Sequence, residues 1–146
     1  MALVNVYLTF NGDCAQAFDF YKSVFGGEFS YSGKFKDMPP VEGQTMSAED
    51  GEKIMHVSLP VSKETTLMGS DTGGEWSSGF KQGNNFSISV TAQSKDEADR
   101  LFNGLSEGGQ VTMPMNKTFW GDYFGMCTDK FGISWMMSFN EAQQQH

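Results

Sequence analysis

Histidine is the side chain that most often transfers protons near neutral pH, and the chain contains two. His146 is the last residue of the sequence, where chain ends tend to fray, so His56 is the candidate general acid or base. A single histidine on a strand is more often a structural residue, and no Ser-His-Asp spacing can be assigned. We therefore keep both interpretations of His56 open, catalytic and structural.

The two cysteines, Cys14 and Cys127, are too few for a disulfide scaffold, and no Cys-x-x-Cys pair exists. Free thiols are typical of a reducing cytosol. No base that would activate Cys127 can be identified in the sequence, so we interpret it as a packed thiol.

Charge and hydropathy argue against several classes of partner. The 146 residues include 10 Lys and Arg against 18 Asp and Glu, a formal net charge of −8. This balance argues against a nucleic-acid partner and gives no support for binding to an anionic membrane. It favours cationic ligands, although an acidic surface also aids solubility. No basic leader and no run of about 18 apolar residues is present, so we expect a soluble cytoplasmic protein outside the membrane.

The elements that must position these residues occur twice along the chain. Residues 4–10 alternate apolar and polar, which indicates a strand with one buried face. Asp13 is a plausible N-cap, with Gln16 completing a capping box. Apolar residues then recur at helical spacing over residues 14–25, and Gly26 and its neighbour end the helix.

The same pattern returns 82 residues later. Residues 85–90 alternate again, Ser94 and Glu97 form a second capping box, and residues 98–105 carry a second apolar helical stripe that ends at Gly108. Coincidence could explain any one element. The shared order of strand, capped helix and double glycine favours an internal duplication.

Each expected helix precedes three further expected strands, so each half is predicted as a β-α-β-β-β module. These strands are residues 29–35, 54–61 and 65–70 in the first half, and 110–115, 123–128 and 133–139 in the second. We expect a single α+β domain, residues 1–146, whose two modules (about 1–72 and 84–146) are joined by a Gly-rich linker. Paired modules would form a curved eight-stranded sheet around a cavity, with helices on the outer face.

Two stretches resemble a known family. Both are similar to the PhnB-like branch, often labelled 3-demethylubiquinone-9 3-methyltransferase-like. The first stretch is Tyr7-Leu8-Thr9-Phe10-Asn11-Gly12 leading into residues 18–27. The second is Trp120-Gly121-Asp122-Tyr123-Phe124-Gly125 leading into residues 128–135. The paired modules resemble the wider vicinal-oxygen-chelate superfamily of glyoxalase I, extradiol dioxygenases and bleomycin-resistance proteins. Lys130 departs from the family pattern, because it replaces a proline in a turn.

The superfamily resemblance implies a divalent metal held by His, Gln and Glu on the first and last strands of each module. The corresponding positions here are Asn5, Met68, Asn85 or Ser87, and Met136. Thioethers suit soft Cu(I) and side-chain amides are weak ligands, so we predict no metal of that kind. Both double glycines end a helix and do not join a strand to a helix, so we predict no nucleotide-type cofactor either.

The family arrangement implies a neutral cavity rich in hydroxyls and amides. Its expected lining is Asn5, Tyr7, Thr9, His56, Ser58, Met68, Ser70, Asn85, Ser87, Ser134 and Met136, with an aromatic rim of Trp120, Tyr123 and Phe124. Such a pocket suits a small, partly polar organic molecule. The alternative is that several of these side chains bond one another and that Trp120 and Phe124 seal a seam between modules or chains.

Three functions remain open from the sequence. The first is a metal-independent binder of an unidentified small molecule, cationic or aromatic, of the bleomycin-resistance type. The second is an enzyme, either one that uses His56 as acid or base or a metal-dependent lyase or dioxygenase of the superfamily, the metal-dependent form being the less favoured. The third is a protein that acts through its dimer surface, since the resemblance implies a homodimer.

Overall fold

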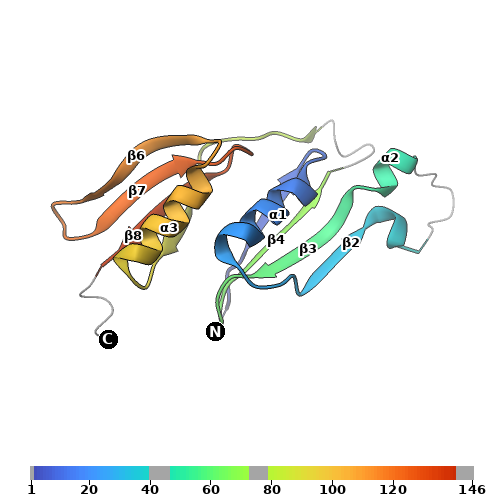
Figure 1. Cartoon of the computed structure of the whole chain (residues 1–146). Coiled ribbons are helices and arrows are strands. Elements are labelled where there is room, and N and C mark those ends of the chain that lie inside the picture. Colours follow the sequence, from blue (N-terminus) through green and yellow to red (C-terminus); the bar gives the residue numbers. More distant parts are fainter. Residues whose placement is uncertain (1, 40–46, 73–78, 141–146) are drawn as a thin grey trace. The chain divides into compact units, whose positions relative to one another are not determined.

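The computed structural model describes residues 2–39, 47–72 and 79–140. The chain divides into two compact units, Met1–Lys81 and Gln82–His146, called here the first and second modules (Figure 1). The first module contains β1 (Val6–Phe10), α1 (Cys14–Phe25), β2 (Tyr31–Lys34), the short 3-10 helix η1 (Phe35–Asp37), α2 (Ala48–Gly51), β3 (Ile54–Pro60) and β4 (Thr66–Asp71). The second contains β5 (Ile88–Thr91), α3 (Lys95–Ser106), β6 (Gln110–Lys117), β7 (Tyr123–Thr128) and β8 (Ser134–Phe139).

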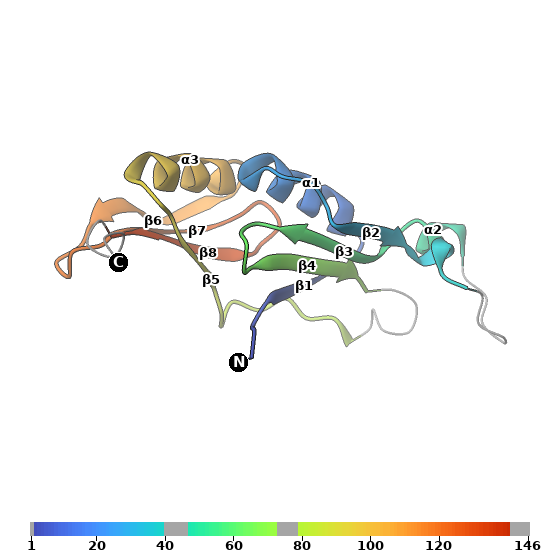
Figure 2. The ribbon, with the colours of Figure 1, turned by 90° about the horizontal axis from the view of Figure 1, so that it is seen from below.

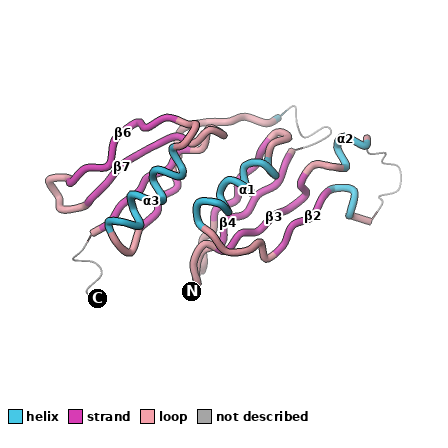
Figure 3. Tube along the Cα trace, in the orientation of Figure 1, coloured by secondary structure: helices cyan, strands magenta, loops and turns pink. Residues whose placement is uncertain are grey.

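Both modules have the same topology, which confirms the predicted α+β class and the repeated β-α-β-β-β order. Each forms a four-stranded mixed sheet, in the order β1-β4-β3-β2 and β5-β8-β7-β6. The first strand pairs parallel with the last, and the other pairs are antiparallel. In each module one long helix lies across one face of the sheet (Figures 2 and 3).

The repeat extends to the pairing of individual residues. Val6 lies opposite Leu67 in the first module, and Ile88 lies opposite Trp135 in the second. Corresponding residues of the two modules are therefore 82 positions apart in the sequence for the first strand and 68 positions apart for the last strand. The same 68-residue shift relates the β3–β4 pairs to the β7–β8 pairs. The two modules thus share one backbone register in these three strands, whereas β-bulges shift the pairing at different places in β2 and β6.

The core of each module lies between the helix and the sheet. The buried face of α1 comprises Cys14, Ala17, Phe18, Tyr21 and Val24, and that of α3 comprises Ala98, Leu101, Phe102 and Leu105. Under these helices the strands bury alternate apolar side chains, because a strand points successive residues to opposite faces. Trp135, only 2% exposed, is such a core residue, as its position on β8 predicts.

The two helices begin differently, and the predicted cap of the first is wrong. The Asp13 side chain makes no capping hydrogen bond. Instead Oδ1 of Asp71, at the end of β4, accepts the backbone N–H groups of Gly12 and Cys14. Asp71 can do this because it pairs with Phe10 at the end of the parallel neighbour β1, immediately before the helix. The buried carboxylate satisfies donors that a helix start leaves open.

At α3 the local cap is confirmed. Oγ of Ser94 accepts a hydrogen bond from the backbone N–H of Glu97. The Glu97 side chain accepts in return from the N–H of Gln93, one residue earlier than a standard capping box requires.

Several strand boundaries differ from the predictions. β5 begins at Ile88, so Asn85 and Ser87 lie outside it, and β1 begins at Val6. Asn5 precedes β1 but is held to β4, because its side-chain oxygen accepts the backbone N–H of Thr66. Between β2 and β3 the structure has the two short helices η1 and α2, which the sequence did not indicate. His146 and most of the expected linker lie outside the described residues. No helix in the described part of the chain is long and apolar enough to cross a membrane.

Candidate ligand-binding site

The candidate site lies on the sheet face that points away from α1, called here the distal face of the first module. Leu8, Phe10 and Leu67 are buried on the helix side. Residues at the alternate positions of the same strands therefore point to the distal face. They include the predicted residues Tyr7, Thr9, Met68 and Ser70, with Tyr7 paired to Met68 and Thr9 to Ser70. The expected parity of these strands is confirmed.

His56 on β3 is the centre of a polar and aromatic cluster on this face. The rings of Tyr7 and His56 are stacked, with centroids 5.5 Å apart and planes 30° apart. A 3.2 Å hydrogen bond joins the Tyr7 hydroxyl and Nδ1 of His56, and a 2.9 Å bond joins Nε2 and Oγ of Ser58. Both ring nitrogens are therefore held by hydroxyl groups. This arrangement fixes the orientation of the imidazole on the sheet.

Tyr31 on β2 completes the cluster from the other side. Its ring centroid lies 5.8 Å from that of His56. The ring occupies the space above Gly33, where an added Cβ would be 2.7 Å from the Tyr31 hydroxyl oxygen. Gly33, which pairs with His56, thus permits Tyr31 to lie beside the imidazole. Tyr7 is 48% and Tyr31 49% exposed, so His56 lies between two half-exposed rings.

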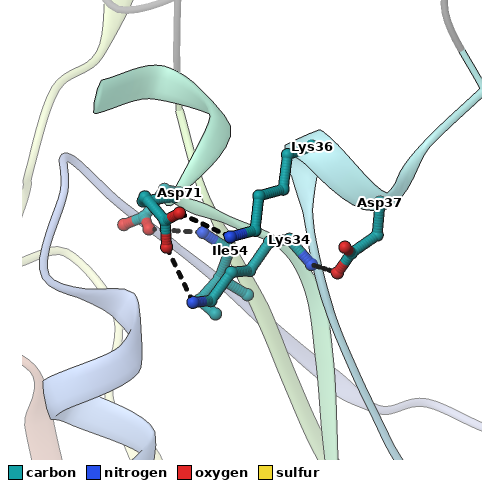
Figure 4. Close-up of polar contacts among 6 residues, drawn as sticks. Lys34, Lys36, Asp37, Ile54 and Asp71 are labelled. Carbon is teal, nitrogen blue, oxygen red and sulfur yellow. Dashed lines mark hydrogen bonds and ion pairs between the residues drawn. The ribbon is translucent and has the colours of Figure 1, made fainter. Parts of the chain in front are cut away.

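The charged groups nearest to this cluster along β2 are paired with one another (Figure 4). Lys34 and Lys36 bind the two carboxylate oxygens of Glu52 at 2.8 Å and 2.5 Å. Asp37 accepts the backbone N–H of Lys34. The hydrogen bonds from Lys34 and Lys36 lower the pKa of the Glu52 carboxyl from 4.5 to about 2. The cluster around His56 itself is made of neutral hydroxyls, rings and a thioether.

Asp71, also drawn in Figure 4, positions the site without belonging to it. Besides the start of α1, its carboxylate accepts the backbone N–H of Ile54 at 2.9 Å. Ile54 begins β3 two residues before His56, so one buried carboxylate anchors both α1 and the strand that carries the imidazole. From the sequence alone this role of Asp71 was missed. The signal was a carboxylate directly after the expected strand 65–70.

In the second module, Ser134 and Met136 of β8 alternate with the buried Trp135 and Met137, so they point away from α3. Met136 lies opposite Ser89 of β5. Asn85 and Ser87 are exposed residues before β5 and do not belong to that sheet. Of the lining residues predicted in this module, Ser134 and Met136 therefore lie on a strand, whereas Asn85 and Ser87 lie in the segment before one.

The three residues of the predicted aromatic rim do not form one group. Trp120 and Phe124 are neighbours, with ring centroids 6.2 Å apart, and the Trp120 indole N–H donates to Asp122. Tyr123 points to the helix side, where its hydroxyl donates to Asp99 of α3. That hydrogen bond raises the pKa of the Tyr123 hydroxyl. Adjacent residues on β7 face opposite ways, so Tyr123 and Phe124 cannot line the same face.

The described residues do not fit the divalent metal site of the superfamily. Nowhere in residues 2–39, 47–72 and 79–140 do three His, Cys, Asp or Glu residues gather in a way that could hold a metal ion. Both thiols lie in the cores. Burial raises the pKa of Cys14, and it raises that of Cys127 to about 11, so neither is a ready thiolate ligand or nucleophile.

The model of the 3-demethylubiquinone-9 3-methyltransferase family matches residues 3–138. The chain belongs to this family. Protein YjdN of Escherichia coli (strain K12) is 30% identical over an alignment 145 residues long that covers 95% of each protein. The crystal structure of protein PA1353 from Pseudomonas aeruginosa is 38% identical, with a TM-score of 0.79 over 96% of this chain and 98% of that one.

More distant structures share the fold. A putative 3-demethylubiquinone-9 3-methyltransferase, PhnB protein, from Bacillus cereus is 22% identical, with a TM-score of 0.70 over 93% of this chain and 98% of that one. A glyoxalase/bleomycin resistance protein/dioxygenase family enzyme from Burkholderia phytofirmans is 12% identical, with a TM-score of 0.60 over 95% and 98% of the two chains. The resemblance to the PhnB-like branch and to the superfamily fold is thereby confirmed.

Proposed function

We propose that this PhnB-like protein binds a small planar organic molecule on the distal face of the first module, without a metal. The observation that carries the proposal is the cluster in which His56 lies between the half-exposed rings of Tyr7 and Tyr31. Half-exposed aromatic side chains offer a flat apolar surface together with a polar group at the tip.

The chemistry of the cluster indicates the class of ligand. Aromatic rings stack on planar molecules, and the hydroxyls of Tyr7 and Tyr31 can exchange hydrogen bonds with polar groups at the ligand's edge. The lysines that follow along β2 and η1, Lys34 and Lys36, are both bound to Glu52 and are thus engaged rather than open to a carboxylate or phosphate. The formal net charge of −8 attracts cations at long range. A planar cation therefore fits better than a planar anion.

Two fluorescent planar probes test this proposal, proflavine as the cation and 1-anilinonaphthalene-8-sulfonate as the anion. We expect saturable binding of one proflavine per chain, with weaker binding of the anion and no change after treatment with EDTA. Tyr31→Ala should weaken proflavine binding, because it removes one of the two rings. Tyr7→Phe, which keeps the ring, should weaken it less than Tyr7→Ala.

Phe119→Ala is the control, because it removes an exposed aromatic ring of the second module that lies outside the expected lining. It should leave proflavine binding unchanged. The proposal is overturned if neither probe binds saturably, if Tyr31→Ala binds like the wild type, or if EDTA abolishes binding.

A role for His56 in proton transfer is the second candidate, favoured by the hydroxyls bonded to both of its ring nitrogens. Native mass spectrometry of the purified chain would distinguish the two roles and would also test the expected homodimer. A retained molecule whose mass is unchanged over time supports binding alone. A molecule that the wild type converts and His56→Ala does not would support the enzyme instead.

A further inference from the structure

We propose that the second module binds one soft monovalent cation, Cu(I), through the thioether sulfurs of Met113, Met126 and Met136. The site lies on the sheet face opposite α3, called here the distal face of the second module. It shares no residue with the aromatic cluster on the first module and uses a different class of ligand atom.

Strand pairing places the three methionines side by side. Met126 of β7 lies opposite Met136 of β8. On its other side Met126 lies opposite Met113 of β6. Three neighbouring strands thus each contribute one thioether to a single row across the sheet. The row continues to Ser89 of β5, which lies opposite Met136.

The spacing of such a row suits a shared ion. Directly opposed residues on paired strands have Cβ atoms about 4.5–5.5 Å apart. A methionine has three rotatable bonds beyond Cα, so neighbouring sulfurs can turn toward a common point while the backbone stays in place. Met113 is 46% exposed, and Met126 and Met136 are partly exposed. An ion can therefore reach the row from solvent.

The chemistry of the row selects a soft ion. Thioether sulfur is a soft ligand that favours Cu(I), whereas Zn²⁺ and Mn²⁺ are served better by imidazole or carboxylate. The row itself contains neither of those groups. Cys127, the residue after Met126, is buried on the helix side and does not compete as a ligand.

The first module provides a built-in comparison. In the shared register Met68 corresponds to Met136, and its cross-strand neighbours are Tyr7 and Ser58. One thioether beside two hydroxyls is a poor site for Cu(I). The proposal therefore predicts one ion per chain, held by the second module alone.

Ag⁺, which has the charge and softness of Cu(I) and needs no reducing agent, is the probe. The full chain, labelled with ¹³C in the methionine methyl groups, is titrated with AgNO₃ in chloride-free buffer. We expect the methyl resonances of Met113, Met126 and Met136 to shift together and to saturate at one Ag⁺ per chain. The resonance of Met68 should not move. Native mass spectrometry gives the stoichiometry independently.

Met126→Leu removes the central sulfur and keeps a similar apolar volume, so the module is expected to fold and to lose the bound Ag⁺. Met68→Leu is the matched control and should retain it. A thermal unfolding curve for each variant checks the fold. The proposal is overturned if the three methyl resonances do not move together, if Met126→Leu retains Ag⁺, or if Met68→Leu loses it.

Discussion

The two modules share their strand order and most of their residue pairing but carry different side chains on their distal faces. Corresponding rows across the sheets read Tyr7, Met68, Ser58 and Tyr31 in the first module, and Ser89, Met136, Met126 and Met113 in the second. His56 corresponds to Phe124. The pairing of the strands is therefore compatible with a hydroxyl-rich aromatic face and with a thioether face. Such freedom explains how one fold can serve unrelated binding functions.

A second difference concerns how each module begins its helix. The start of α1 is held by Asp71, 57 residues away from Cys14 along the chain. The start of α3 is held by Ser94, the residue immediately before it. The second module uses its own buried carboxylate, Asp129, elsewhere: it accepts the backbone N–H groups of Phe131 and Ile133 and the Trp135 indole N–H. One helix start thus depends on tertiary contact, and the other depends on local sequence.

Removal of Asp71 tests this difference most severely. Asp71→Ala leaves three backbone N–H groups without their acceptor and should lower the free energy of unfolding by about 3–5 kcal/mol. Asp71→Asn, which keeps one acceptor oxygen, should lower the free energy of unfolding by less. Urea unfolding gives the free energies. Hydrogen exchange should accelerate at the start of α1 in Asp71→Ala and not in Asp129→Ala, and equal protection there in both variants would contradict the assigned role.

The close approach of α1 to β4 is tested by Gly69. A Cβ at this position would lie 2.6 Å from Cε2 of Phe18 and 2.8 Å from the backbone oxygen of Leu8. Gly69→Ala should therefore cost about 1–3 kcal/mol through overpacking. Its counterpart in the second module is Met137, which is buried with its full side chain. Gly79→Ala, where a Cβ meets nothing within 4 Å, is the control, and equal unfolding midpoints for the two variants would disprove the tight contact.

The two predicted caps should respond differently to the same substitution. Ser94→Ala removes the acceptor for the N–H of Glu97 and should cost about 1 kcal/mol. Asp13→Ala should change stability much less, because the Asp13 side chain makes no capping bond. Thermal unfolding of the two variants measures the difference. An equal loss in both would mean that α1 depends on a local cap after all.

The smallest effect is expected at the exposed charges beside β2. The pKa of Glu52 is lowered from 4.5 to about 2 by Lys34 and Lys36, so its ionised form is favoured by folding. Its contribution to stability is present above the ordinary pKa and is lost as the pH falls through about 2. Glu52→Gln should therefore change the unfolding midpoint only slightly at pH 7, since exposed ion pairs contribute little. The difference between Glu52→Gln and the wild type should shrink further below pH 4, and titration by NMR gives the pKa directly.

Much of the fold could be predicted because its signals are local. The alternation of Leu8 and Phe10 with Tyr7 and Thr9 was sufficient to assign the two faces of β1. The Ser94 cap lies within four residues of the groups it serves. The prediction that Tyr123 and Phe124 belong to one aromatic rim was wrong, because it disregarded the alternation of side chains along a strand.

By itself the sequence determined the repeated modules and which residues of each strand face the helix, because side-chain alternation and helical periodicity act over a few residues. Tertiary structure alone decided that Tyr7, His56 and Tyr31 meet, and that three methionines form one row. It also decided that Asp71 holds the start of α1. These contacts join strands far apart in the chain, and their pairing is set by the summed packing of the whole sheet, which no short stretch of residues encodes.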